Sequence, residues 1–245
     1  MSYPYFFTDS SNIGENKIKI SGEDLNHLKN VLRSRPGDIV YISDNDKYKY
    51  ETEILDIGKS EAILIVKNKK QITRKLPELI LFQCILKKNS MEFVIQKSTE
   101  IGVDRIIPVM SRRVIADSRK IPSKIDRWQK ISDGASKQSK RDFKCEVMEP
   151  ADIYSINVRE YGLFYVPYEE STTGGENLAE TLNAGSNISS IAFIIGPEGG
   201  FEAGEVDFLK NNGAREIRLG SNIYRSETAV IYFLSVLDYL TGNQK

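Results

Sequence analysis

Residues 1 to about 70 contain short runs of Tyr, Ile and Val in which apolar and polar residues alternate in places. A period of two is typical of strands with one buried face, and the Gly, Pro, Asn and Asp between the runs are typical of turns. The pattern predicts five strands, at residues 3–7, 17–20, 38–42, 48–57 and 62–66. Five short strands and one inserted helix indicate a small β-barrel.

The inserted helix is predicted at residues 22–33. Leu25, Leu28 and Leu32 recur there at spacings of three and four, which places them on one face of a helix. The only histidine of the chain, His27, lies on the same helix. We interpret it as a packed surface residue rather than a general base.

The pattern changes after a polar, basic linker at residues 68–77. A continuous apolar run is typical of a strand buried on both faces of a parallel sheet. From here, predicted strands at 79–86, 105–109, 162–166, 191–195 and 216–219 alternate with predicted helices at 90–101, 121–139, 177–183, 203–211 and 227–240. This alternation predicts an α/β fold with a mainly parallel sheet. We therefore expect two domains, at residues 1–70 and 71–245.

The composition is that of a globular protein, with 40% hydrophobic and 28% charged residues. No apolar run approaches the roughly 18 residues that span a membrane, and the first residues lack the pattern of a secretion signal. Cys84 and Cys145 show no metal-ligand spacing and indicate reduced, buried thiols. We expect a cytoplasmic protein without a membrane partner or a metal site.

The net charge is zero, but the charges are separated along the chain. Residues 111–145 contain eleven Lys or Arg residues and four Asp residues, an excess of seven positive charges. Residues 146–210 contain twelve acidic residues and only Arg159 and Lys210 as cations, an excess of ten negative charges. The basic segment is typical of proteins that bind nucleic-acid phosphates, although a solvated charged helix without a partner has the same pattern.

Two glycine-bearing loops follow apolar strands near the C-terminal end. Residues 196–200 read Gly-Pro-Glu-Gly-Gly, and residues 219–229 begin with Leu-Gly and end with Arg-Ser-Glu-Thr-Ala. Small ligands bind at the carboxyl ends of strands in open α/β sheets, so we expect these two neighbouring loops to hold one ligand. Ser226 is a candidate N-cap of the last helix. Arg225 lies beside it at the helix N-terminus, where the dipole disfavours a cation, which indicates a substrate that is anionic or develops negative charge.

Several common catalytic sites are excluded by the residue types present. Because the only histidine, His27, is interpreted as a packed residue, we expect no Ser-His-Asp triad, no zinc cluster and no Cys-His pair. The glycine loops match neither the dinucleotide fingerprint nor the phosphate-binding loop with its lysine. Chemistry that depends on positioning fits this residue set, and methyl transfer from an activated sulfonium donor is such a reaction.

The chain resembles the RsmE-type 16S ribosomal RNA (uridine-N3) methyltransferase family of the SPOUT superfamily over nearly its whole length. The matching blocks are the two glycine loops and residues 27–33, 36–38, 93–102 and 138–141. The resemblance implies a PUA-like β-barrel that binds RNA, followed by a SPOUT methyltransferase domain, an α/β domain with a deep trefoil knot near its C-terminus. It also implies S-adenosylmethionine as the cofactor and a homodimer.

The resemblance also implies a donor pocket, residue by residue. The cofactor-binding candidates are Pro167, Ile195, Gly196, Pro197, Gly199, Gly200, Leu219, Gly220, Ile223, Tyr224, Arg225 and Thr228. Two positions depart from the family pattern. Tyr5 stands where many relatives have an arginine, and Tyr224 stands where the second loop commonly has a leucine.

We expect the protein to methylate N3 of a specific uridine in the 16S rRNA of the small ribosomal subunit. N3 of neutral uridine carries a proton, so the enzyme must favour the anion. Arg225 is the candidate for stabilising that charge, and Glu227, or with less support Glu198, for taking the proton. The predicted RNA-binding residues are Arg33, Arg35, Arg112, Arg113, Arg127, Lys137 and Arg141.

Three other functions remain open on the sequence. A ribose 2′-O RNA methyltransferase of the same superfamily would share the pocket. A non-catalytic, RNA-binding ribosome-assembly factor would bind RNA without the methyl donor. A nucleotide-hydrolysing enzyme is disfavoured by the missing lysine of the phosphate-binding loop.

Overall fold

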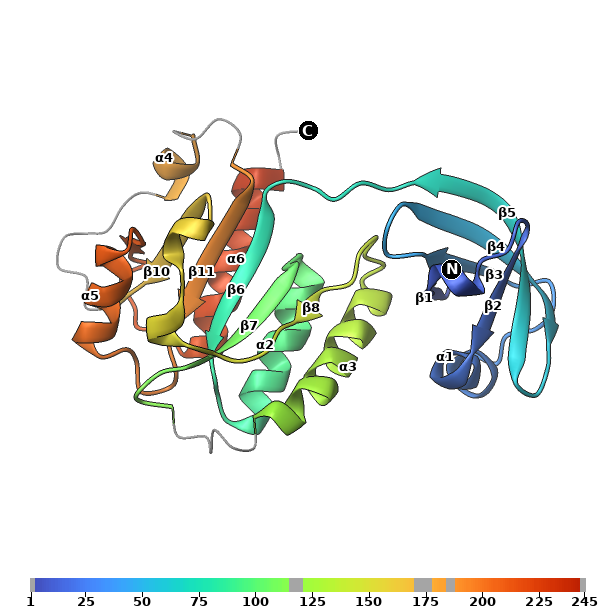
Figure 1. The fold of residues 1–245 in the computed structure, drawn as a ribbon, viewed down its shortest axis with the longest axis horizontal. Helices are drawn as coiled ribbons and strands as arrows, with labels where there is room; N and C mark the ends of the chain where they lie inside the picture. Colours follow the sequence, from blue (N-terminus) through green and yellow to red (C-terminus); the bar gives the residue numbers. More distant parts are fainter. Residues whose placement is uncertain (1–2, 115–120, 170–177, 184–187, 243–245) are drawn as a thin grey trace. The chain divides into compact units, whose positions relative to one another are not determined.

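The computed structural model describes residues 3–114, 121–169, 178–183 and 188–242 (Figure 1). The chain forms two compact units, one of Met1–Arg74 with Lys137–Lys144, and the other of Lys75–Ser136 with Cys145–Lys245. Arg119 and Lys120 of the basic segment, and Asn177 at the start of a predicted helix, lie outside the described residues.

The first unit is built on a mixed five-stranded sheet in the order β1-β3-β4-β5-β2. β1 pairs with β3 in parallel, and the other neighbours are antiparallel. The strands are β1 (Tyr5–Phe7), β2 (Lys17–Ser21), β3 (Ile39–Ser43), β4 (Tyr48–Ile57) and β5 (Glu61–Gln71), and a short 3₁₀ helix, η1 (Ser10–Asn12), precedes β2. All five predicted strands are confirmed. However, β5 continues through the first residues of the predicted linker.

Residues 137–144 pack within this first unit, although they follow the second unit in sequence. Ser43 Oγ donates a hydrogen bond to the backbone oxygen of Asp142 at 2.6 Å, and Lys49 Nζ lies 3.0 Å from the Asp142 carboxylate. The backbone N–H of Lys144 donates to Asn45 Oδ1 at 2.7 Å. These contacts join a segment distant in sequence to the β3–β4 turn.

The helix of the first unit begins as α1 (Gly22–Asn26) and continues as a wider turn, η2 (His27–Val31). The N–H of Leu32 donates to the oxygen of His27, five residues earlier, at 3.0 Å. The spacing predicted Leu25, Leu28 and Leu32 on one helix face, but only Leu25 and Leu28 are buried, whereas the Leu32 side chain is 41% exposed. The wider turn rotates the last residues away from the face that a regular helix buries.

The second unit is built on a parallel sheet in the order β12-β10-β11-β6-β7-β8, with β9 also paired to β7. The strands are β6 (Glu78–Cys84), β7 (Arg105–Met110), β8 (Glu146–Val147), β9 (Ala151–Asp152), β10 (Leu163–Pro167), β11 (Ser190–Ile195) and β12 (Arg215–Ile217). The predicted parallel α/β sheet is confirmed. The strands β8 and β9 were not predicted, because two residues are too short to show a period.

Helices cover both faces of this sheet (Figure 1). Successive residues of β6 point to opposite faces, with Leu81 in the cluster that contains Trp128 and Phe233, and Phe82 in the cluster that contains Leu209. The helices are α2 (Lys88–Ile101), α3 (Pro122–Gln138), α4 (Leu178–Asn183), α5 (Ala203–Asn211) and α6 (Ser226–Gly242), with short 3₁₀ helices η4 (Ile153–Ser155) and η5 (Val158–Glu160). In the part of the chain that the structure describes, no helix has the length and apolar character needed to cross a membrane.

Candidate functional site

A cavity of about 440 Å³ lies at the carboxyl ends of β10, β11 and β12. These strands are parallel and adjacent, in the order β12-β10-β11, so the segments that follow them meet at one edge of the sheet. The two glycine loops were expected to be neighbours, but β10 lies between their strands. Its last residue, Pro167, consequently reaches the cavity wall together with both loops.

Most of the predicted cofactor residues line this cavity. They are Pro167, Ile195, Gly196, Pro197, Gly200, Leu219, Gly220, Ile223, Tyr224 and Arg225. Gly199 and Thr228 are not among the lining residues. Sequence reasoning missed Lys87, Ser90, Tyr168, Glu169 and Arg218, which also form the wall. Tyr168 and Glu169 come shortly after the predicted strand at 162–166, so their place near its carboxyl end was the available signal.

The first glycine loop is a tight turn that requires glycine at one position. The N–H of Gly200 donates to the oxygen of Pro197 at 3.0 Å, and Gly200 has a φ of +70°, which favours glycine. A Cβ atom at Gly200 would lie 3.0 Å from Oε1 of Glu169. A side chain here would therefore push against a carboxylate of the cavity wall.

Ser226 joins the two glycine loops. Its Oγ donates a hydrogen bond to the backbone oxygen of Gly196 at 2.7 Å and accepts one from Nε2 of the buried Gln83 at 3.0 Å. The backbone hydrogen bonds of α6 begin at the residue before Ser226. The backbone oxygen of Arg225 accepts from the N–H of Ala229 at 2.8 Å. Ser226 thus lies inside the helix, and the N-cap prediction is corrected to a link between loops.

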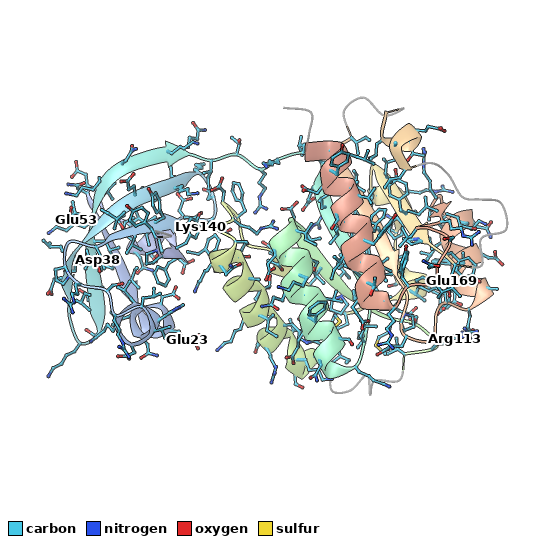
Figure 2. The ribbon with its side chains drawn as sticks, turned by 180° about the vertical axis from the view of Figure 1, so that it is seen from behind. Glu23, Asp38, Glu53, Arg113, Lys140 and Glu169 are labelled. Atoms are coloured by element: carbon cyan, nitrogen blue, oxygen red, sulfur yellow. The ribbon has the colours of Figure 1, made fainter. Side chains whose placement is uncertain are left out.

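A buried carboxylate connects the segment after β7 to the helix after the first glycine loop. Glu205 is fully buried, and its two oxygens accept from the N–H groups of Arg112 and Glu202, each at 2.8 Å. Arg113 then donates from Nη1 to the backbone oxygen of Gly199 at 2.9 Å. Gly199 consequently faces Arg113 rather than the cavity. Figure 2 shows Arg113 and Glu169 on the same side of the second unit.

Tyr224, the departure in the second loop, is accommodated by Gly220. A Cβ atom at Gly220 would lie 3.0 Å from the Tyr224 hydroxyl oxygen. The Tyr224 ring stacks on Tyr232 of α6, with centroids 5.2 Å apart and an interplanar angle of 23°. The aromatic ring therefore fixes the second loop against the last helix. The other departure, Tyr5, is buried in the first unit.

The cavity wall carries charges of both signs. The catalytic candidates Arg225, which is exposed, and Glu227, which is half-buried, both line it. Glu198 also lines it, and its Oε1 accepts the N–H of Lys87 at 3.1 Å, which ties the first loop to the start of α2. The remaining charges are Lys87, Glu169 and Arg218. Across the described ranges, no three His, Cys, Asp or Glu side chains gather as a metal site would require.

The predicted RNA-binding residues are divided between the units. Arg33, Arg35, Lys137 and Arg141 belong to the first unit, and Arg112, Arg113 and Arg127 to the second. Several have protein partners: Nε of Arg127 lies 2.9 Å from the Glu92 carboxylate, and Lys137 pairs with Asp24. Nε of Arg141 donates to the backbone oxygen of Phe143 at 3.1 Å.

A second hollow, of about 970 Å³ and mostly apolar, lies along α2 and α6, which pack side by side (Figure 2). Phe93 of α2 is 42% exposed there, and Tyr239 of α6 is 70% exposed. Ser90 and Glu227 line both this hollow and the first cavity. Two large aromatic side chains are therefore exposed to solvent on this face.

Comparisons with known proteins identify both parts of the chain as domains of RNA methyltransferases. A family model described as an RNA methyltransferase domain matches residues 74–238, and one described as an RNA methyltransferase PUA domain matches residues 20–67. The ribosomal RNA small subunit methyltransferase E of Bacillus subtilis (strain 168) is 32% identical, over 91% of this chain and 90% of its own length. The chain belongs to the ribosomal RNA small subunit methyltransferase E family. A member from Mesomycoplasma hyopneumoniae (strain 232) is 29% identical, over 95% of this chain and 97% of its own length.

Solved structures show the same fold. A protein from Legionella pneumophila, described as a methyltransferase and solved with the cofactor SAM, is 27% identical with a TM-score of 0.84, over 98% of both chains. A methyltransferase E from Neisseria gonorrhoeae, with a TM-score of 0.85 over 98% of both chains, is 24% identical and supports the fold. The predicted fold class, a PUA-like β domain followed by a SPOUT α/β domain, is confirmed.

Proposed function

We propose that this chain transfers a methyl group from S-adenosylmethionine to N3 of a specific uridine in 16S rRNA, in the cytoplasm and as a homodimer. The observation that carries the proposal is the cavity lined by both glycine loops, which the Ser226–Gly196 hydrogen bond joins, in a member of the methyltransferase E family. The relatives are named for the ribosomal RNA of the small subunit.

The cavity fits S-adenosylmethionine in size and in charge. Its volume of about 440 Å³ is within the range of small-molecule sites. Gly200 and Gly220 keep the backbone free of side chains at the wall, so a ligand can contact main-chain groups. Three carboxylates and three cations on the wall match a ligand with one carboxylate, one ammonium and one sulfonium group. When bound, this ligand supplies an electrophilic methyl group.

Two charged residues of the wall have roles in the reaction. Glu227 takes the proton from N3 of the uridine, and Arg225 stabilises the negative charge that spreads onto O2 and O4. S-adenosylmethionine bound in the cavity would supply the methyl group that replaces this proton on N3. Both side chains line the cavity, so neither role requires a residue outside it.

The RNA backbone contacts the exposed cations after β7 and those of the first unit. Arg112 and Arg113 are exposed and are held beside the first glycine loop by Glu205 and Gly199. Removing one cation that binds a phosphate should reduce the log–log salt dependence of RNA binding by about one unit. Arg127 and Lys137 form closer ion pairs than Arg112, whose Nε lies 3.7 Å from the Glu202 carboxylate, so they should contribute less than Arg112.

The homodimer is supported by the apolar hollow along α2 and α6. Phe93 and Tyr239 are large side chains exposed on this face, and a second copy would cover them. Ser90 and Glu227 line both the hollow and the donor cavity. Dimerisation would therefore complete the wall of the donor site.

Nucleoside mass spectrometry of 16S rRNA incubated with the protein and S-adenosylmethionine tests the proposal. We expect a base-methylated uridine, and Arg225→Ala should abolish its formation while most of the donor affinity, measured calorimetrically, is kept. A ribose-methylated nucleoside would replace the base-methylation proposal. RNA binding without any donor affinity would favour an assembly factor. If Arg225→Ala reduced only donor affinity and had normal turnover at saturation, Arg225 would be a cofactor residue without a catalytic role.

A further inference from the structure

The end of the helix in the first unit carries an exposed surface that combines apolar and cationic side chains. Val31 is 67% exposed and Leu32 is 41% exposed, and Arg33 and Arg35 beside them are also exposed. We call these four residues the helix-end surface. The leucine spacing alone did not indicate this exposed apolar surface.

Arg33 has a backbone conformation that normally belongs to glycine. Its φ is +54°, and the N–H of the next residue, Ser34, donates to the oxygen of Leu28 at 3.0 Å and closes the helix. Glycine is the usual residue at such a left-handed position after a helix, because a Cβ atom there costs free energy. A cation near a helix C-terminus is stabilised by the helix dipole. This effect does not explain Arg33, because Lys29 already supplies a cation in the last turn.

Among the residues that the structure describes, the Arg33 side chain has no partner that would offset this cost. In the described ranges, neither the Arg33 nor the Arg35 guanidinium forms an ion pair or hydrogen bond, although the backbone N–H of Arg35 donates to Asp38 Oδ2 at 2.7 Å. Two available guanidinium groups beside two exposed apolar side chains match the chemistry of single-stranded RNA. Its phosphates are anionic, and its unstacked bases offer apolar faces.

We propose that the helix-end surface binds a single-stranded segment of the RNA substrate, with an unstacked base against Val31 and Leu32 and phosphates on Arg33 and Arg35. The inference rests on the proposed function and adds a base contact to it. The left-handed arginine is retained because its side chain binds RNA. The apolar pair remains exposed because a base covers it in the complex.

Two substitutions at Arg33 separate RNA binding from stability. Arg33→Gly relieves the backbone cost, so the thermal midpoint should rise by about 2 °C. Arg33→Ala removes the same charge but keeps a Cβ atom, so it should give no such rise. Both should weaken binding of a labelled single-stranded oligouridine several-fold and flatten the salt slope by about one unit. Unchanged affinity in both variants would overturn the inference.

The apolar contact is tested by Val31→Ser and Leu32→Ser. Each should weaken oligouridine binding up to about tenfold without changing the salt slope, because the cations that bind the phosphates are still present. Leu55→Ser is the matched control, since Leu55 is a 48% exposed residue of β4 in the same unit, and it should bind as the unmodified protein does. If all three serine variants bind alike, the base contact is absent.

The remaining outcomes are also decisive. If Val31→Ser and Leu32→Ser bind protein-free RNA normally but bind assembled small subunits weakly, the surface meets a ribosomal protein and the RNA inference fails. Failure of the proposed function has a different signature, in which the unmodified protein does not methylate uridine in 16S rRNA at all. Oligouridine binding by the helix-end variants is measured without the methyl donor, so it is independent of that result.

Discussion

At the scale of single residues, Ser226 connects the two loops of the donor cavity. In Ser226→Ala, the Gly196 oxygen loses its donor and the Gln83 amide loses an acceptor. Leaving buried polar groups without partners costs about 1–3 kcal/mol. A loss of about 1.4 kcal/mol in binding free energy raises the dissociation constant tenfold. We therefore expect S-adenosylmethionine affinity to fall about tenfold in a calorimetric titration.

The matched control for this prediction is Asp238→Ala on the same helix. Asp238 is exposed and lines neither the donor cavity nor the apolar hollow, so its replacement should leave donor affinity within about twofold. Equal affinities for Ser226→Ala and the unmodified protein would show that the loops hold their positions without this hydrogen bond.

Also at the residue scale, the buried thiol of Cys84 should make stability depend on alkaline pH. Burial raises the pKa of Cys84 from 9.0 to about 12. Between these values the unfolded thiol loses its proton while the folded thiol keeps it, so rising pH favours unfolding. The expected slope is about 1.4 kcal/mol per pH unit from this group.

Denaturant unfolding of the unmodified protein and of Cys84→Ala between pH 9 and pH 12 measures this effect. The alanine variant should be less stable at neutral pH but should lose stability less steeply as the pH rises. Tyr5 adds a slope of the same sign, because its burial and the charge of Asp142 raise the pKa of its hydroxyl. Parallel slopes for both proteins would show that the thiol ionises equally in the two states.

At the scale of elements, Glu205 holds α5 and the segment after β7 together. Glu205→Ala leaves the N–H groups of Arg112 and Glu202 without their acceptor, which should cost about 2–4 kcal/mol of unfolding free energy. Glu205→Gln keeps one acceptor oxygen and should be less destabilised. Urea unfolding measures both, and Asp207→Ala, an exposed position on α5, should stay within about 0.5 kcal/mol. A Glu205→Ala protein as stable as the Asp207→Ala control would contradict the assignment.

The elements that a regular period defines were predictable from the sequence. The bounds of β4 and α5 agree with the prediction, because strong alternation marks β4 and Gly213 marks the stop after α5. The pattern failed where the backbone departs from a regular period, as in the wider turn at residues 27–31 that exposes Leu32. A local pattern cannot show such a departure, because the same leucine spacing fits a regular helix.

At the scale of the whole molecule, the sequence indicated that the two glycine loops lie together but not how the cavity between them is built. The two glycine loops were predicted to share one ligand, and both line one cavity. The position of β10 between their strands follows from strand order, which pairwise contacts across the sheet determine. The link from Ser226 to Gln83 spans 143 residues, and the packing of residues 137–144 in the first unit is equally non-local. Contacts between residues so far apart in the sequence cannot be inferred from the local spacing of apolar and polar residues.

The last prediction concerns the assembly of two copies. Phe93→Glu places a charge in the apolar hollow of α2 and α6, where a second copy would otherwise cover the ring. Burying an unpaired charge is costly, so sedimentation should show a monomer. Because Ser90 and Glu227 line both the hollow and the donor cavity, loss of the dimer should also reduce rRNA methylation. Met148→Glu, at an exposed position outside the hollow, should leave the dimer and the activity unchanged. A Phe93→Glu protein that still sediments as a dimer would assign the interface to another face, and one that is monomeric but fully active would separate assembly from the donor site.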